Sequence, residues 1–185
     1  MEELKVGQVI ISEQVEPSEN YERFKELVKK KKISVTVLKD NNLNSPQKLK
    51  IEKGLYFEIL WPDNRKMIFD NALNNNSIVC KLNYKNTSVL FTGDIEKIAE
   101  NQILETYINN VNLLNSTILK VAHHGSISSS TKDFLDIVKP KIALIGVDKN
   151  NKFGHPDKEV INRLEQMRMQ NLPNRSNGRN NNKNW

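Results

Sequence analysis

The chain has 185 residues, which is enough for one domain with a hydrophobic core or for most of a larger domain. Hydrophobic residues make up 37% and charged residues 27%, which is typical of a folded globular protein and excludes a wholly disordered one. No apolar run approaches the roughly 20 residues that cross a bilayer, and the first residues do not resemble a secretory signal, so we expect neither a membrane span nor a leader. The single cysteine, Cys80, excludes an internal disulfide.

The formal net charge of +6 suits a polyanionic partner such as nucleic acid, because lysine and arginine neutralise phosphates. Four consecutive lysines, Lys29 to Lys32, carry part of this charge. They also follow a helical pattern, and cations at the carboxyl end of a helix favour its dipole while staying solvated. The charge by itself therefore leaves two alternatives open, nucleic-acid binding and a solvated helix end.

Hydrophobic periodicity predicts the helices and strands in chain order. A helix is expected to begin at Ser18 and to end in the lysine run, with Tyr21, Phe24 and Leu27 on its apolar face. Further helices are predicted over residues 95–108, 131–138 and 158–167. Strands are predicted over residues 6–11, 33–37, 48–51, 56–61, 77–84, 88–91, 117–121 and 142–147, the last of them central in its sheet. Residues 40–47 are predicted to form a loop, and residues 64–76 to be irregular.

Strands alternate with helices in the second half of the chain, which is typical of a layered α/β domain with buried sheets. Cys80 alternates with Ile78 and Leu82, so we expect it to be a small core residue. We assign residues 1–168 to one domain. Residues 169–185 have almost no apolar side chains and no periodicity, so they are predicted to be a disordered tail.

Every histidine in the chain follows an apolar strand and lies near a glycine. Asp94 ends the segment Phe-Thr-Gly-Asp, His123 and His124 lie in Ala-His-His-Gly-Ser, and His155 lies in Phe-Gly-His-Pro. Tight turns at strand ends hold side chains rigidly around one point, and imidazole and carboxylate groups bind zinc or manganese. Each segment alone is also typical of a structural turn, but together they indicate a metal site.

Four segments occur in an order that identifies a family resemblance: Asn-Asn-Asn-Ser-Ile-Val (74–79), Leu-Phe-Thr-Gly-Asp (90–94), Leu-Lys-Val-Ala-His-His-Gly-Ser (119–126) and Asn-Lys-Phe-Gly-His-Pro (151–156). This order resembles the metallo-β-lactamase domain of the ComEC family of DNA-internalisation proteins, over residues 6–167. The resemblance implies a partial αββα sandwich. It also implies hydrolysis of a DNA phosphodiester by a hydroxide bound to one or two zinc or manganese ions. The parent family is membrane-associated, whereas this piece alone is expected in the cytoplasm.

The same resemblance assigns roles to individual residues. Asp94 would be a metal ligand, bridging two ions where two bind, and would orient the attacking water, with His124 as its catalytic partner. One or both of His123 and His124, together with His155, would hold metal or substrate phosphate, and the sequence does not divide these roles. Lys120 and Ser126 would contact phosphate.

The main ligand motif of that superfamily, His-x-His/Asp-x-Asp-His, is absent, because no histidine precedes His123. We therefore expect a hydrolase that is weak or inactive in this form. The alternatives are a nucleic-acid-binding module without catalysis and a non-functional gene remnant. Missing outer strands would expose sheet edges, so we also expect a marginally stable or aggregation-prone chain.

The predicted tail departs from the family, which continues from the last helix into a strand that reads like Tyr-Arg-Thr-Asp. Back-translation of residues 169–185 with permitted codons restores that pattern when it is read one nucleotide later. This agreement predicts a frameshift near Met169, and sequencing of the gene would test it.

Overall fold

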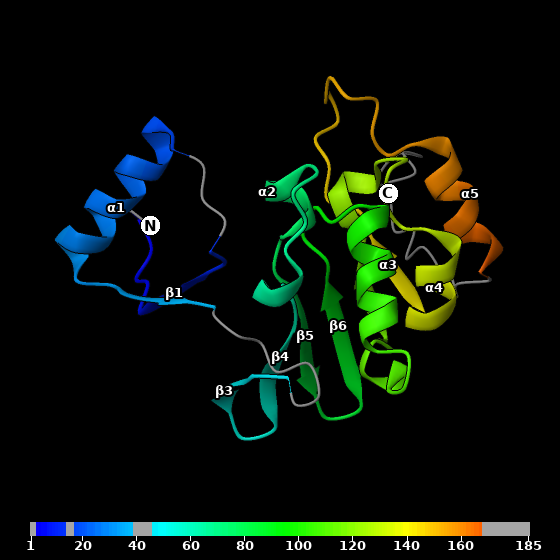
Figure 1. Cartoon of the computed structure of the whole chain (residues 1–185), viewed down its shortest axis with the longest axis horizontal. Coiled ribbons are helices and arrows are strands. Elements are labelled where there is room, and N and C mark those ends of the chain that lie inside the picture. The colour runs from blue at the N-terminus through cyan, green and yellow to red at the C-terminus, as the bar shows by residue number, and fades with distance from the viewer. Residues whose placement is uncertain (1–2, 14–16, 39–45, 168–185) are drawn as a thin grey trace, which may run out of the picture.

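The computed structural model describes residues 3–13, 17–38 and 46–167, in which two separate β-sheets are present. The strands are β1 (Gln8–Ile11), β2 (Ser34–Val37), β3 (Lys48–Glu52), β4 (Leu55–Trp61), β5 (Val79–Tyr84), β6 (Thr87–Phe91), β7 (Ile118–Lys120) and β8 (Ile142–Leu144). The α-helices are α1 (Glu19–Lys31), α2 (Ala72–Asn75), α3 (Lys97–Thr106), α4 (Lys132–Val138) and α5 (Lys158–Gln166) (Figure 1). Short 3-10 turns are η1 (Asn64–Lys66), η2 (Val111–Leu113) and η3 (Ala122–Gly125). In these ranges no helix is both long and apolar enough to cross a membrane.

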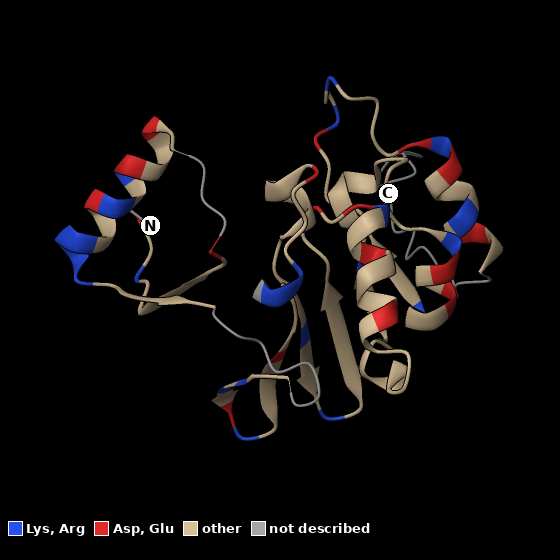
Figure 2. Ribbon diagram, in the orientation of Figure 1, with Lys and Arg blue, Asp and Glu red and all other residues tan. Residues whose placement is uncertain are grey.

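The first sheet consists of β1 and β2, which pair in parallel and are connected through α1. Ser18 begins α1 as predicted, because its hydroxyl accepts a hydrogen bond from the amide of Tyr21 at 3.2 Å. The last turn carries Lys29, Lys30 and Lys31, which are exposed and suit the negative end of the helix dipole (Figure 2). The lysine run therefore lies at the carboxyl end of the helix, as one of the two alternatives predicts, and its binding of nucleic acid stays a prediction.

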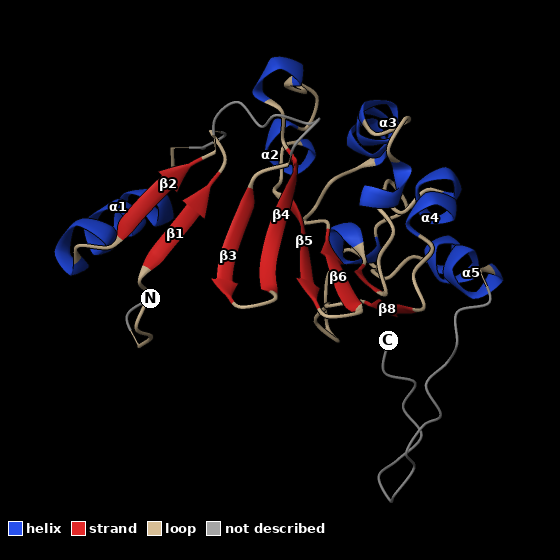
Figure 3. Ribbon diagram, turned by 90° about the horizontal axis from the view of Figure 1, so that it is seen from below, coloured by secondary structure: helices blue, strands red, loops and turns tan. Residues whose placement is uncertain are grey.

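The second sheet has the strand order β3-β4-β5-β6-β7-β8 (Figure 3). The first four strands are antiparallel to their neighbours, and β6, β7 and β8 run parallel. Parallel strands need crossover connections, which α3 and α4 provide. As a result, the carboxyl ends of β6, β7 and β8 meet at one edge of the sheet.

Helices α3, α4 and α5 lie together beside the second sheet and cover one of its faces (Figure 3). Alternate residues of the strands point toward them, so that Leu90 and Leu119 are buried between sheet and helices. The rest of the core is made of the buried side chains Leu60, Trp61, Ile68, Val79, Ile95, Ala99, Ile103, Tyr107, Leu114, Val121, Ala122, Phe134, Leu135, Val138, Val160 and Leu164. This core supports the ends of the three parallel strands.

The opposite face of the second sheet is also apolar, but within the described residues it stays partly exposed. Its residues pair across the strands in register and comprise Phe57, Cys80, Leu82, Val89, Phe91, Ile118, Ile142 and Leu144, with Lys120 as a charged neighbour. We call these eight apolar residues the open sheet face. The side chains of Phe91 and Leu144 are 36% and 52% exposed. An uncovered apolar area of this kind favours association.

The mixed α/β class predicted from the sequence is confirmed. Three details are wrong. The strand predicted over residues 142–147 ends at Leu144 and lies at the edge of the sheet instead of its centre. Cys80 is only partly buried, because it points to the open sheet face and not to the core. The segment 64–76 contains η1 and α2. The predicted tail, residues 169–185, and the proposed frameshift lie outside the described residues.

Candidate functional site

The residues singled out by the sequence lie after the carboxyl ends of β6, β7 and β8. Asp94 follows β6, His123 and His124 follow β7, and His155 lies in the loop between β8 and α5. Since these three strands are parallel, the segments leave the sheet at the same edge. The topology therefore brings together side chains that are up to 61 positions apart in the chain.

The turn that holds Asp94 depends on Gly93. Gly93 has a φ of +56°, and an added Cβ would lie 2.6 Å from the Cβ of Ser77. The Ser77 hydroxyl accepts a hydrogen bond from the amide of Asp94 at 3.3 Å. The carbonyl of Gly93 accepts from the amide of His123 at 3.1 Å, which joins this turn to the histidine turn. Only glycine combines this conformation with such a close approach.

The carboxylate of Asp94 lies between two basic groups. Its Oδ1 is 3.9 Å from Nε2 of His124 and 3.9 Å from Nζ of Lys120. Lys120 also donates a hydrogen bond to the carbonyl of Gly93 at 3.2 Å. Burial lowers the pKa of Lys120, while the negative charge of Asp94 opposes that shift. These three side chains are partly exposed, so they are accessible to a ligand.

The two neighbouring histidines are held in different ways. Both have left-handed backbone conformations, with φ of 47° for His123 and 54° for His124. Nδ1 of His124 lies 2.5 Å from the carbonyl oxygen of Gly146. A carbonyl oxygen can only accept, so this hydrogen bond places a proton on Nδ1, and Nε2 is the nitrogen that faces Asp94. The two rings therefore have different partners: His124 contacts Gly146 and Asp94, and His123 contacts Glu96 and His155.

His123 turns toward Glu96, a residue that the sequence reading missed. Its Nδ1 is buried, has no hydrogen-bond partner in the described part of the chain, and lies 3.5 Å from Oε1 of Glu96. On its other side the ring meets that of His155, with centroids 5.8 Å apart in an edge-to-face arrangement. Glu96 was not recognisable from spacing, although it lies only two residues after Asp94.

Glu96 is in turn fixed by residues from two other segments. Its Oε1 accepts a hydrogen bond from the hydroxyl of Ser128 at 3.0 Å, and its Oε2 accepts one from the side-chain Nδ2 of Asn75 at 3.3 Å. The hydroxyl of Ser126 lies 3.0 Å from that of Ser128. Ser126, predicted to contact phosphate, is buried in this network. Its role toward a substrate stays a prediction.

The loop that carries His155 is held by hydrogen bonds from one of its own residues, Asn151. The side-chain amide of Asn151 donates to the carbonyl of His155 at 2.7 Å, and its oxygen accepts from the amide of His155 at 3.0 Å. Pro156 packs against Gly125, where an added Cβ would lie 2.7 Å from the Cβ of Pro156. The exposed ring of Phe153 stacks on that of His155. The contact between Pro156 and Gly125 therefore holds His155 next to the turn that carries His123 and His124.

The donor chemistry suits zinc or manganese, but the set is incomplete. Residues 3–13, 17–38 and 46–167 contain no group of three or more His, Cys, Asp and Glu side chains that could hold a metal ion. Asp94 and His124 supply two donors that face each other, whereas catalytic zinc usually has three protein ligands. The residues therefore fit as part of a metal centre. The assignments of Asp94, His123, His124 and His155 as ligands stay predictions.

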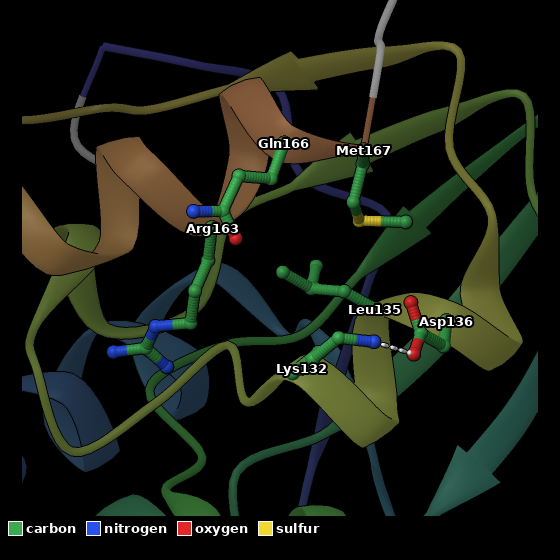
Figure 4. Close-up of a pocket in the computed structure, with 6 residues that line it drawn as sticks. All are labelled: Lys132, Leu135, Asp136, Arg163, Gln166 and Met167. Atoms are coloured by element: carbon green, nitrogen blue, oxygen red, sulfur yellow. Dashed lines mark hydrogen bonds and ion pairs between the residues drawn. The ribbon is translucent and has the colours of Figure 1, made fainter.

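A shallow pocket between α4 and α5 contains none of the predicted site residues (Figure 4). It is lined by Lys132, Leu135, Asp136, Arg163, Gln166 and Met167. Lys132 and Asp136 form an ion pair one helical turn apart. Both side chains are exposed, and such pairs are common on helix surfaces. The pocket shows no convergence of catalytic groups.

No family model matches the chain, but comparison with known proteins finds several relatives. It is 33% identical to ComE operon protein 3 of Bacillus subtilis over 113 residues, which are 61% of this chain and 14% of that protein. It is 35% identical to competence protein ComA of Neisseria gonorrhoeae over 111 residues, 60% of this chain and 15% of that protein. It is 34% identical to recombination protein 2 of Haemophilus influenzae over 112 residues, 60% of this chain and 13% of that protein.

These similarities support a competence-type family of the ComEC kind, as the sequence motifs predicted. The aligned part spans only about a seventh of each relative, 13% to 15% of its length.

Proposed function

We propose that this chain carries part of the phosphodiester-hydrolysing site of a metallo-β-lactamase-type domain that acts in DNA uptake. The observation that carries the proposal is the position of Asp94, whose Oδ1 lies 3.9 Å from both the His124 imidazole and the Lys120 ammonium. A carboxylate and an imidazole that face each other suit a divalent cation, and the adjacent ammonium suits a phosphate. The competence proteins among the relatives favour DNA as the substrate class, and the family resemblance implies a membrane-associated parent protein.

In this proposal Asp94 Oδ1 and His124 Nε2 would hold zinc or manganese. When bound, such an ion lowers the pKa of its water to about 7 and polarises a phosphoryl oxygen. Lys120 binds a non-bridging phosphate oxygen and offsets its charge. His123, whose ring is in contact with that of His155, would offer its Nε2 as a further ligand, and His155 would offer a donor to a second phosphate oxygen.

Because the chain contains no His-x-His/Asp-x-Asp-His segment, the site is incomplete. We therefore expect metal binding to be easier to detect than turnover. Hydrolysis of a phosphodiester such as bis(p-nitrophenyl) phosphate is expected to be slow or absent with this chain alone.

The test is titration of the purified chain with zinc and with manganese by calorimetry. Asp94→Ala is expected to weaken binding at least about 10-fold, because one of two facing donors is lost. The matched control is Asp133→Ala, since Asp133 is an exposed carboxylate in the first turn of α4. Equal affinity of the wild type and Asp94→Ala would refute the metal site. Strongly salt-dependent DNA binding that Asp94→Ala leaves unchanged would favour the non-catalytic nucleic-acid module instead.

A further inference from the structure

We infer that Glu96 is a positioning residue that sets the tautomer of His123, with the proton on Nδ1 and with Nε2 left free as the acceptor or ligand nitrogen. The usefulness of that free nitrogen depends on the proposed function, whereas the tautomer itself does not. Glu96 Oε1 is 3.5 Å from His123 Nδ1, and that nitrogen is buried with no hydrogen-bond partner in the described ranges.

The carboxylate of Glu96 does not cap the helix that it precedes. Glu96 is the N-cap residue of α3, where a side chain ordinarily accepts a hydrogen bond from the first turn of the helix. Its side chain makes no such bond. The amide of Lys97 donates instead to the carbonyl of Ser128 at 2.8 Å. The carboxylate is therefore free to turn toward the histidine.

The carboxylate of Glu96 is held in one orientation by its hydrogen bonds. The buried side chain of Asn75 contacts Glu96 twice: its Oδ1 accepts from the Glu96 backbone amide at 3.0 Å, and its Nδ2 donates to Oε2 at 3.3 Å. This leaves Oε1 toward Ser128 and His123. A carboxylate can only accept, so the neighbouring buried Nδ1 is stabilised when it carries the proton.

The consequence is that both histidines of the pair carry the proton on Nδ1, although different groups impose it. For His124 the partner is the carbonyl of Gly146, and for His123 it is Glu96. Histidines that bind metal are commonly held in this way by a carboxylate or carbonyl on the opposite nitrogen. In both rings Nε2 is then the nitrogen that remains for a ligand.

The substitution Glu96→Gln tests the inference. Nδ2 of Asn75 donates to Oε2 of Glu96, so it needs a hydrogen-bond acceptor at that position in the variant as well. The glutamine oxygen is expected to take the place of Oε2 facing Asn75, so its amino group faces His123. A donor next to Nδ1 would then favour the tautomer protonated on Nε2. The substitution keeps the size of the side chain and reverses the preference of the imidazole.

The measurement is long-range 1H–15N correlation NMR on the full chain with labelled histidines. It is made without metal, at about pH 8, above the usual imidazole pKa of about 6.5. The His123 signals are identified by their loss in His123→Asn. We expect Nδ1–H for His123 in the wild type and Nε2–H in Glu96→Gln. His124 is an internal control, which is expected to keep Nδ1–H in every variant. Glu105 is an exposed glutamate of α3, and Glu105→Gln is the matched variant that is expected to leave the His123 tautomer unchanged.

An Nε2–H tautomer of His123 in the wild type would overturn the inference without any variant. An unchanged His123 tautomer in a folded Glu96→Gln chain would overturn it as well. If Glu96→Gln fails to fold, Ser128→Ala provides a second test, because it frees Oε1 of Glu96 and keeps the carboxylate. His123 is expected to retain Nδ1–H in this variant. Loss of Nδ1–H from His123 in Ser128→Ala would also overturn the inference. Absence of zinc binding by the wild type would count against the proposed function alone, because the tautomer is measured without metal.

Discussion

The imidazole Nε2 of His124 lies 3.9 Å from the carboxylate Oδ1 of Asp94, and these two residues come from turns after different strands. Two backbone contacts keep them facing each other. The carbonyl of Gly93 accepts from the amide of His123, and the carbonyl of Gly146 is bonded to Nδ1 of His124. The separation is slightly larger than a single ion would require of two ligands at 2.0 to 2.2 Å. A small inward movement of either side chain would bring both into coordination range.

Gly125→Ala is expected to destabilise the histidine turn. Gly125 has a φ of +82°, and an added Cβ would lie 2.7 Å from the Cβ and 3.2 Å from the Cα of Pro156. Strain and displacement together are expected to reduce the free energy of unfolding by roughly 1 to 3 kcal/mol. Urea denaturation followed by circular dichroism measures this.

Gly146→Ala is the matched control for that substitution. Nothing lies within 4 Å of the position of its added Cβ. Its effect is expected to stay within about 0.5 kcal/mol. Equal effects of the two substitutions would show that the contact between Gly125 and Pro156 does not matter.

Glu100→Ala is expected to destabilise the chain by roughly 2 to 3 kcal/mol. The buried carboxylate of Glu100 accepts hydrogen bonds from the amides of Ser130 and Thr131, at 2.5 Å and 2.8 Å, and from the Thr131 hydroxyl at 2.7 Å. Removal of the acceptor leaves these donors without a partner at the start of α4. Glu105→Ala, on the exposed side of the same helix, is the control and should change stability by less than about 0.5 kcal/mol. Similar stabilities of the two variants would contradict the prediction.

The thiol of Cys80 is expected to react slowly with a thiol reagent such as DTNB. Burial raises its pKa from 9.0 to about 11. Because this pKa is raised, the folded chain has about 100-fold less Cys80 thiolate below pH 9 than an unperturbed cysteine would have. The thiolate is the form that reacts with the reagent. The rate should keep rising through pH 9 to 11 and should increase on unfolding in urea. A rate in the folded chain equal to that in urea at pH 8 would contradict this.

The open sheet face is expected to bind ANS and to promote self-association, because it is an apolar area that stays partly exposed within the described residues. Phe91→Thr removes a large apolar side chain from this face while keeping a good strand former. It is expected to lower ANS fluorescence and the fraction of oligomer in sedimentation velocity. Phe69→Thr is the control, because Phe69 is 91% exposed but lies outside the sheet. Equal decreases for both variants would assign the effect to general hydrophobicity instead of to this face.

Local patterns were sufficient for most elements of the fold. The helix cap at Ser18, the β3–β4 hairpin and the position of α4 after Thr131 were predictable, because capping groups and alternation act over a few residues. Strand order was not. The apolar segment after Lys141 was expected at the centre of the sheet, but β8 lies at the edge with Leu144 exposed. Hydrophobicity alone does not distinguish a central strand from one at the edge of the described sheet.

The amino-acid sequence by itself determined the α/β class, the turns that carry Asp94 and the three histidines, and the similarity to competence proteins. Those features depend on residue types and on short spacings. Only the tertiary structure decided which nitrogen of His124 faces Asp94, and only it placed Glu96 beside His123. Both relationships join segments far apart in the chain, and hydrogen-bond direction depends on distances of a few tenths of an ångström that no spacing encodes.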